Sequence, residues 1–161
     1  MRVYLACTIR GDRSRLAVAR ALGAAIEAAG HDLMTARFLE ERAEDEDGRL
    51  TPAQVFERDL AWLDACEVLV AEASGSSYGV GFEVGYVLSR AARSGQRVVL
   101  LYDAALAERV SRMITGNTHP CCTTAGYRDA AEARARLEAA LAAVSAGGDR
   151  RGPVPDASGI R

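Results

Sequence analysis

The sequence contains no lysine, because all 20 of its basic residues are arginine. This absence excludes mechanisms that need a lysine amine, such as a Schiff base or the lysine–phosphate contact of a Walker-type loop. Histidine is scarce, with only His31 and His119, and the four cysteines form no Cys-x-x-Cys pair. We therefore expect no zinc site and no other metal.

The sequence also lacks an excess of charge of one sign, because it has 22 acidic and 20 basic residues and a net charge of -2. This balance provides no basic surface for a nucleic acid polymer or an anionic membrane, and we expect neither as a partner. No segment approaches the length of a membrane span, and the amino terminus opens directly on a strand pattern without a charged leader. We expect a cytoplasmic protein with reduced thiols.

What the chain does have is 161 residues, 49% of them hydrophobic, which suffices for one domain with a sizeable core. Buried-strand patterns alternate with helical periodicity. The expected strands are 3–8, 31–36, 67–73, 98–102 and 121–127, and the expected helices are 14–29, 52–66, 79–93, 105–115 and 130–144. The alternation predicts a single α/β domain over residues 1–146, a doubly wound (Rossmann- or flavodoxin-like) parallel sheet of about five strands with helices on both faces.

Two further segments lack a regular pattern. Residues 39–48 are acidic and polar, and we interpret them as an exposed, mobile loop rather than a functional lid. Residues 147–161, rich in Gly, Pro and Arg, are expected to be a disordered tail. The sequence assigns no role to the Cys121–Cys122 pair.

Two carboxylates fall on the apolar stripes of predicted helices, where an ionised group is costly unless it is paired or used. The neighbours of Asp59 at helical spacing are Val55, Phe56, Trp62, Leu63 and Cys66, and those of Glu83 are Val80, Tyr86 and Val87. Both helices flank the predicted strand 67–73. We therefore expect an active site there, although each carboxylate alone is equally compatible with a cap or a salt bridge.

Two glycine-containing loops are expected to meet at the carboxyl edge of the sheet, where ligands of doubly wound folds bind. They are residues 7–11, after the first strand, and residues 74–81, after the third. The helix that follows each loop suits a phosphate, and Arg10 can add a bidentate contact. A surface salt bridge is an equal alternative for Arg10, and the Gly-x-Gly at 79–81 does not complete a dinucleotide fingerprint.

Several segments together resemble one family. They are residues 4–11 (YLACTIRG), 56–63 (FERDLAWL) followed by 68–72 (VLVAE), 77–85 (SYGVGFEVG) and 110–114 (VSRMI). In order and spacing they resemble the nucleoside 2-deoxyribosyltransferase superfamily, and most closely its 2'-deoxynucleoside 5'-monophosphate N-glycosidase (N-hydrolase) branch. The resemblance spans residues 3 to about 116.

The resemblance implies the roles of individual residues. Glu83 corresponds to the nucleophile, Asp59 to the acid that protonates the departing base, and Tyr4 to a tyrosine that orients the nucleophile, although Tyr4 alone reads as a core residue. The phosphate and sugar pocket is implied at Ile9, Arg10, Gly11, Ser77, Gly79 and Gly81. Ser111 corresponds to a serine that reaches the phosphate in the neighbouring subunit, which implies a homodimer with shared sites.

The function implied is hydrolysis of the N-glycosidic bond of a nucleoside 5'-monophosphate by a retaining two-carboxylate mechanism that needs no cofactor. The resemblance favours a 2'-deoxy sugar. Cys7 stands where the branch usually has Gly, and Tyr78 where it usually has an aliphatic residue. These two departures leave the base preference undecided. Three alternatives stay open. The first is a ribonucleotide N-glycosidase acting on CMP or hydroxymethyl-CMP, although that branch has Pro-Phe-Arg where this chain has Thr8-Ile9-Arg10. The others are a base-exchanging nucleoside deoxyribosyltransferase and a non-catalytic nucleotide-binding protein.

Overall fold

The computed structural model describes residues 1–10 and 13–147. The elements in chain order are β1 (Arg2–Ala6), α1 (Leu16–Ala28), β2 (Asp32–Leu33), η1 (Ala36–Leu39), α2 (Ala43–Asp47), α3 (Pro52–Ala65), β3 (Val68–Glu72), α4 (Tyr78–Ser94), β4 (Arg97–Asp103), η2 (Ala104–Leu106), α5 (Arg112–Thr115), β5 (Cys122–Tyr127) and α6 (Ala130–Ala146). Gly11 and, from residue 148 on, the predicted tail lie outside the described residues.

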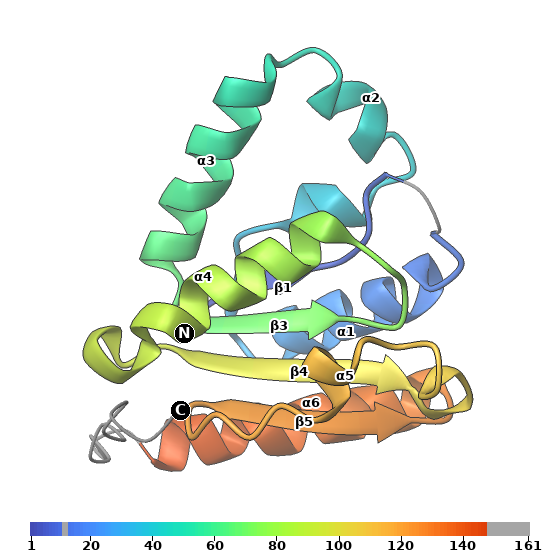
Figure 1. Cartoon of the computed structure of the whole chain (residues 1–161), viewed down its shortest axis with the longest axis vertical. Helices are drawn as coiled ribbons and strands as arrows, with labels where there is room; N and C mark the ends of the chain where they lie inside the picture. The colour runs from blue at the N-terminus through green and yellow to red at the C-terminus, as the bar shows by residue number, and fades with distance from the viewer. Residues whose placement is uncertain (11–12, 148–161) are drawn as a thin grey trace, which may run out of the picture.

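The five strands form one parallel sheet in the order β2-β1-β3-β4-β5. Helices α1 and α6 cover one face, and α3 and α4 lie on the other (Figure 1). The chain leaves β1 in one direction to form β2 and in the other to form β3, so the strand order reverses beside β1. The predicted doubly wound α/β fold is confirmed, and the reversal places a ligand crevice beyond the carboxyl ends of β1 and β3.

Alternate residues of β1 enter two separate cores because successive side chains of a strand point to opposite faces. Val3 and Leu5 pack with α1 and α6. Tyr4 and Ala6 pack on the other face, against Phe38 and the apolar side of α4. The catalytic candidates Tyr4, Asp59 and Glu83 therefore belong to the face that carries α3 and α4.

Local signals explain the ends of α3. Thr51 caps its first turn in a reciprocal capping box with Gln54, and Pro52 occupies the first helical position. At the other end, the side-chain amide of the buried Gln96 donates to the carbonyl oxygens of Leu63 and Cys66 at 2.7 and 2.9 Å. These two bonds satisfy carbonyls that the helix itself leaves unpaired.

Three predicted elements differ from the structure. The second strand is limited to Asp32–Leu33, and the predicted helix 105–115 is divided into η2 and α5. Residues 39–48, predicted to be an exposed loop, contain helix α2, in which Ala43 and Asp47 are buried. The interpretation of this segment as a mobile loop is therefore wrong for its helical part, because buried side chains attach it to the domain.

Candidate active site

Tyr4 and Glu83, 79 residues apart in sequence, meet on the α3–α4 face. Tyr4 lies in the middle of β1 and is fully buried. Its hydroxyl donates a hydrogen bond to Oε1 of Glu83 at 2.7 Å. Glu83 lies in the second turn of α4 and is half-buried. The ring of Phe38 contacts the Tyr4 ring edge-on, with the centroids 6.0 Å apart, and fixes the direction of the hydroxyl.

The environment of this pair perturbs both groups. Burial raises the pKa of Glu83 to about 7, the hydrogen bond from Tyr4 opposes this rise, and the charge of Asp59 adds to it. Burial, followed by the charge of Glu83, raises the pKa of Tyr4 above its ordinary value, so the phenol remains a donor. A carboxyl group that exchanges its proton near neutral pH is a typical feature of active sites.

Asp59, on α3, completes the set. Nε of the adjacent Arg58 donates to Oδ1 of Asp59 at 2.8 Å. Burial raises the pKa of Asp59, and the hydrogen bond and charge of Arg58 counteract that rise. The charge of Asp59 acts on Glu83 and on Tyr4, which places the three groups in one electrostatic site.

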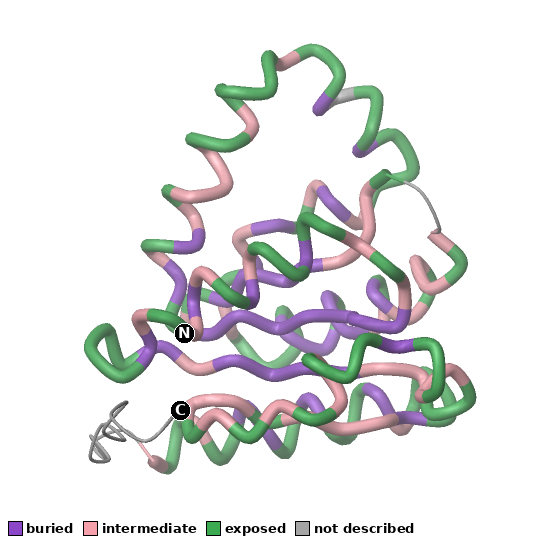
Figure 2. The backbone as a smooth tube through the Cα atoms, viewed as in Figure 1, coloured by how far each residue is buried: buried purple, intermediate pink, exposed green. Residues whose placement is uncertain are grey.

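The helices that carry the two carboxylates are more open than their apolar stripes predict. On α3 only Leu63 is buried, and Phe56 and Phe82 are each 52% exposed. Figures 1 and 2 show the cause: α3 leans away from the sheet, and most of its length is exposed or half-buried. The prediction of an apolar stripe around Asp59 therefore holds only toward the end of α3 near the sheet, where Trp62 and Leu63 pack into the core of the α3–α4 face, whereas Phe56 on the other side is half exposed.

The first turn of α4 is uncovered. Ser77 caps it, and the Ser77 hydroxyl accepts a hydrogen bond from the N–H of Val80 at 3.3 Å. A Cβ added at Gly81 would meet no atom within 4 Å, and one added at Gly79 would meet only Oγ of Ser77, at 3.7 Å. Packing within the chain therefore does not require these glycines, and the helix N-terminus is open to an anion.

The other predicted binding residues that the structure describes, Ile9, Arg10 and Ser111, lie in different environments. Ile9 packs against the core of the α3–α4 face. The side chain of Arg10 is 68% exposed, and its Nε lies 3.9 Å from Oε1 of Glu44. Such a pair contributes little and leaves the guanidinium available. Ser111 caps α5, which packs beside β5, and no described contact joins Ser111 to Tyr4, Asp59 or Glu83.

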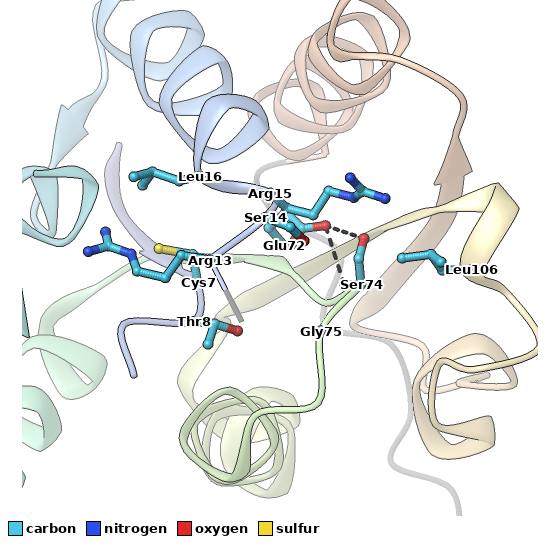
Figure 3. A pocket seen from close by; sticks show the side chains of 10 residues that line it. All are labelled: Cys7, Thr8, Arg13, Ser14, Arg15, Leu16, Glu72, Ser74, Gly75 and Leu106. Carbon is cyan, nitrogen blue, oxygen red and sulfur yellow. Dashed lines mark hydrogen bonds between the residues drawn. The ribbon is translucent and has the colours of Figure 1, made fainter. Parts of the chain in front are cut away.

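A pocket opens at the carboxyl edge next to this site (Figure 3). It encloses about 350 Å³, open solvent included, and is lined by Cys7, Thr8, Arg13, Ser14, Arg15, Leu16, Glu72, Ser74, Gly75 and Leu106. Thr8 belongs to the loop that carries Ile9 and Arg10, and Gly75 to the loop that leads to Ser77. The pocket therefore adjoins both loops that the sequence predicted to meet, although the three catalytic candidates do not line it.

Glu72, a buried carboxylate at the end of β3, is a residue that the sequence pattern does not distinguish. Its Oε1 accepts hydrogen bonds from the hydroxyl of Tyr127 at 2.7 Å and from the hydroxyl of Ser74. The Ser74 hydroxyl in turn accepts from the N–H of Asp103 at 2.7 Å. Burial raises the pKa of Glu72, and the bonds from Ser74 and Tyr127 oppose the rise. This network joins the ends of β3, β4 and β5 and fixes the start of the loop before α4.

Within residues 1–10 and 13–147, no three or more His, Cys, Asp and Glu side chains are grouped to hold a metal ion. Across the same residues, no helix is long and apolar enough to cross a bilayer.

Comparisons with known proteins show the family and the fold of this chain. A family model described as Nucleoside 2-deoxyribosyltransferase matches residues 3–116. A Thermofilum pendens protein, provisionally named 2'-deoxynucleoside 5'-phosphate N-hydrolase 1, is 41% identical over 141 residues, 88% of this chain and 95% of that protein. The 5-hydroxymethyl-dUMP N-hydrolase of Mus musculus is 33% identical over 117 residues, 71% of this chain and 64% of that protein. The solved CMP N-glycosidase of Clostridium botulinum shares the fold, with a TM-score of 0.65 at 19% identity over 88% of this chain and 100% of that one.

Proposed function

The chain belongs to the nucleoside 2-deoxyribosyltransferase family, which confirms the resemblance of its motifs, and we propose that it hydrolyses the N-glycosidic bond of a nucleoside 5'-monophosphate. The products are the free base and a sugar 5-phosphate. The observation that carries the proposal is the 2.7 Å hydrogen bond from Tyr4 to Glu83 in a site that also feels the charge of Asp59. Two carboxyl groups in unequal environments are what cleavage of a glycosidic bond requires.

In the first step, the carboxylate of Glu83 attacks the anomeric carbon while the bond from that carbon to the base breaks. Asp59 transfers its proton to the departing nitrogen, so the base leaves as a neutral molecule. Tyr4 donates to Oε1 of Glu83, and among the described residues Oε2 has no hydrogen-bond partner. Tyr4 therefore holds the nucleophile by one oxygen and leaves the other to form the glycosyl ester.

In the second step, water attacks the anomeric carbon of the ester, and Asp59, now ionised, accepts a proton from that water. The bond between the sugar and Glu83 breaks, and the carboxylate is restored. The burial that raises the pKa of Asp59 favours its service as an acid, and the neighbouring Arg58 favours the ionised form needed here. No step requires a cofactor.

The 5'-phosphate is assigned to the open N-terminus of α4, with the Ser77 hydroxyl and the uncovered backbone of Gly79 and Gly81. The helix dipole and unpaired N–H groups favour an anion there. Arg10 supplies a guanidinium from the loop after β1, which also carries Ile9. We propose a 2'-deoxy sugar, because the Thermofilum pendens and mouse relatives carry names that specify deoxynucleotides.

The test is base release from a panel of deoxynucleotides, ribonucleotides including CMP and hydroxymethyl-CMP, and nucleosides without phosphate, followed by chromatography. Deoxynucleoside monophosphates are expected to react, and the nucleosides to react poorly. Glu83→Gln is expected to lower kcat more than about a thousandfold. The control Glu57→Gln, an exposed carboxylate on α3, should retain activity. Tight binding of a monophosphate without base release would overturn the proposal in favour of a non-catalytic binder.

The covalent intermediate is tested in the same reaction. Intact-mass spectrometry of acid-quenched protein should detect a glycosyl adduct on the wild type and none on Glu83→Gln. Addition of a second free base then distinguishes hydrolysis from base exchange, since both pass through the same ester. Formation of the exchanged nucleotide faster than hydrolysis would identify a transferase instead.

We also propose a homodimer with shared sites. Phe56, Phe82 and Tyr86 form a contiguous aromatic surface with centroid separations of 6.1 and 6.2 Å. Phe56 and Phe82 are half exposed, and the nearby α4 residue Tyr78 is fully exposed. A second copy covering this surface would remove apolar area from water and supply Ser111 to the phosphate.

Mixing two inactive variants tests this arrangement. If Glu83 of one subunit and Ser111 of the other build one site, a heterodimer of Glu83→Gln and Ser111→Asp contains one site with both residues intact. Co-refolded variants should therefore recover activity that neither homodimer shows. A monomer in sedimentation velocity, or no recovery on mixing, would leave Ser111 without a role in the site.

A further inference from the structure

Arg58 connects the catalytic acid to a second, buried carboxylate. Its Nε donates to Oδ1 of Asp59 at 2.8 Å, and its Nη1 donates to Oδ1 of Asp47 at 2.9 Å. Nη2 also lies 2.8 Å from Oδ1 of Asp59. The side chains of Asp47, Arg58 and Asp59 are 9%, 15% and 19% exposed, so solvent screens these contacts much less than surface ion pairs.

Two aromatic rings hold the guanidinium in place. The Cζ of Arg58 lies 5.6 Å from the centroid of Phe38 and 5.0 Å from that of Trp62. Phe38 also contacts Tyr4, so the plane of Arg58 is set by the same core that orients the nucleophile. A lysine would keep the charge but lose the planar fork and much of the stacking.

Asp47 is the part of the acidic segment that reaches this site. It ends α2 and is 8% exposed, whereas its neighbours Glu44 and Asp45 are exposed. Arg37, from η1, approaches Oδ1 of Asp47 at 3.4 Å. Burying a carboxylate is costly unless it is paired, and Asp47 is paired with Arg58 and Arg37. The acidic segment is therefore linked to Asp59 through the ion pairs of Arg58.

We propose that Arg58 is a positioning residue for the catalytic acid, and that Asp47 sets how firmly Arg58 holds Asp59. The inference rests on the proposed role of Asp59 in base release. All described bonds to Asp59 from Arg58 are made at Oδ1, and Oδ2 has no partner among the described residues. Arg58 thereby leaves one oxygen of Asp59 free to carry the proton that passes to the departing base.

Loss of Arg58 and loss of Asp47 are expected to shift the pKa of Asp59 in opposite directions. The charged and titratable groups that face Asp59 are Arg58 on α3, Asp47 on α2, Arg37 on η1, Glu83 on α4 and Tyr4 on β1. The positive charge of Arg58 lowers the pKa of Asp59, while the negative charge of Asp47 raises it. Loss of Arg58 should therefore make Asp59 hold its proton more tightly, and loss of Asp47 should do the reverse.

The experiment is a carboxyl ¹³C NMR titration of Asp59 in the wild type, Arg58→Gln and Asp47→Asn, assigned with Asp59→Asn. We expect Arg58→Gln to raise the pKa of Asp59 by about one unit or more, and Asp47→Asn to lower it by a smaller amount. Arg90→Gln is the matched control, because Arg90 also pairs with an aspartate, Asp64, and stacks on an aromatic ring, 5.0 Å from the centroid of Tyr86. It should leave the Asp59 titration unchanged. Shifts in the same direction for Arg58→Gln and Asp47→Asn, or no shift, would overturn the proposal.

Kinetics separate positioning from charge. In the pH profile of kcat/KM, the limb that reports Asp59 should move to higher pH in Arg58→Gln, by the same amount as in the titration. Arg58→Lys should leave the pKa of Asp59 near that of the wild type, because the positive charge is retained. It should lower kcat with little change in KM, because lysine lacks the planar guanidinium that orients Asp59. Equal kcat for Arg58→Lys and the wild type would contradict a positioning role. If the wild type released no base, the proposed function would fail, while the titrations would still decide whether Arg58 and Asp47 control Asp59.

Discussion

Tyr4→Phe removes the hydroxyl that donates to Glu83 at 2.7 Å and keeps the ring in the core. A hydrogen bond to a charged acceptor contributes about 1.5–3 kcal/mol, which corresponds to about one to two units in the pKa of that acceptor. The pKa of Glu83 is raised to about 7 with this bond in place. Without the bond, which favours the ionised form, the pKa should rise to about 8–9.

The consequence is an activity loss that depends on pH. Only ionised Glu83 attacks, so at pH 6 the kcat/KM of Tyr4→Phe should be about 10- to 100-fold below that of the wild type. At pH 9 Glu83 is almost fully ionised in the wild type and at least about half ionised in Tyr4→Phe, so the difference should shrink to about twofold or less. The assay is steady-state base release between about pH 5.5 and 9.5, with constant ionic strength.

Tyr127→Phe is the matched control, because it removes another buried hydroxyl that donates to a carboxylate, Glu72, also at 2.7 Å. It should reduce stability comparably but leave the Glu83 limb of the pH profile in place. A loss in Tyr4→Phe that is constant from pH 6 to 9 would contradict this prediction, because Tyr4 would then act through geometry and not through the ionisation of Glu83.

Three further predictions concern stability. Because the pKa of Glu83 rises from 4.5 in the unfolded chain to about 7 in the folded one, protonation favours the folded state, and wild-type stability should fall as pH increases through this window. Glu83→Gln should therefore be more stable than the wild type above pH 7, by about 1–3 kcal/mol, and no more stable at pH 4, as calorimetry can check. Ser74→Ala leaves the N–H of Asp103 and the Glu72 carboxylate short of a partner, and urea unfolding should show a cost of about 1–3 kcal/mol; an unchanged midpoint would mean that water replaces the hydroxyl. Thr51→Ala breaks the capping box with Gln54 and should cost about 1 kcal/mol, whereas Thr51→Asp should restore most of it.

The order of strands and helices could be predicted because each buried strand is a short apolar run and each helix repeats its apolar residues. The exception at β2 has a local cause. The Thr35 hydroxyl accepts from the N–H of Leu5 at 2.9 Å and donates to the carbonyl of Leu5 at 2.8 Å. A side chain thus takes over the bonds that a longer second strand would make, and propensity does not reveal such a substitution.

For the site, helical spacing singled out Asp59 and Glu83, since a carboxylate among apolar neighbours departs from the pattern. The same test did not detect Asp47, one of six acidic residues within 39–48, all equally polar in sequence. Only the packing of α2 distinguishes it, by burying one member beside Arg58. Glu72 was missed because it is the last residue of a strand, where a polar residue is ordinary.

Tyr4 belongs to the middle of a central strand, hydrogen-bonded between β2 and β3. Such backbone segments exchange their amide hydrogens only through openings close to global unfolding, whereas terminal helices and loops open at far lower free energy. The orientation of Glu83 thus depends on the part of the molecule that is last to open. Because the tyrosine stays in register until the sheet opens, its hydrogen bond to Glu83 should persist on heating until the sheet itself melts.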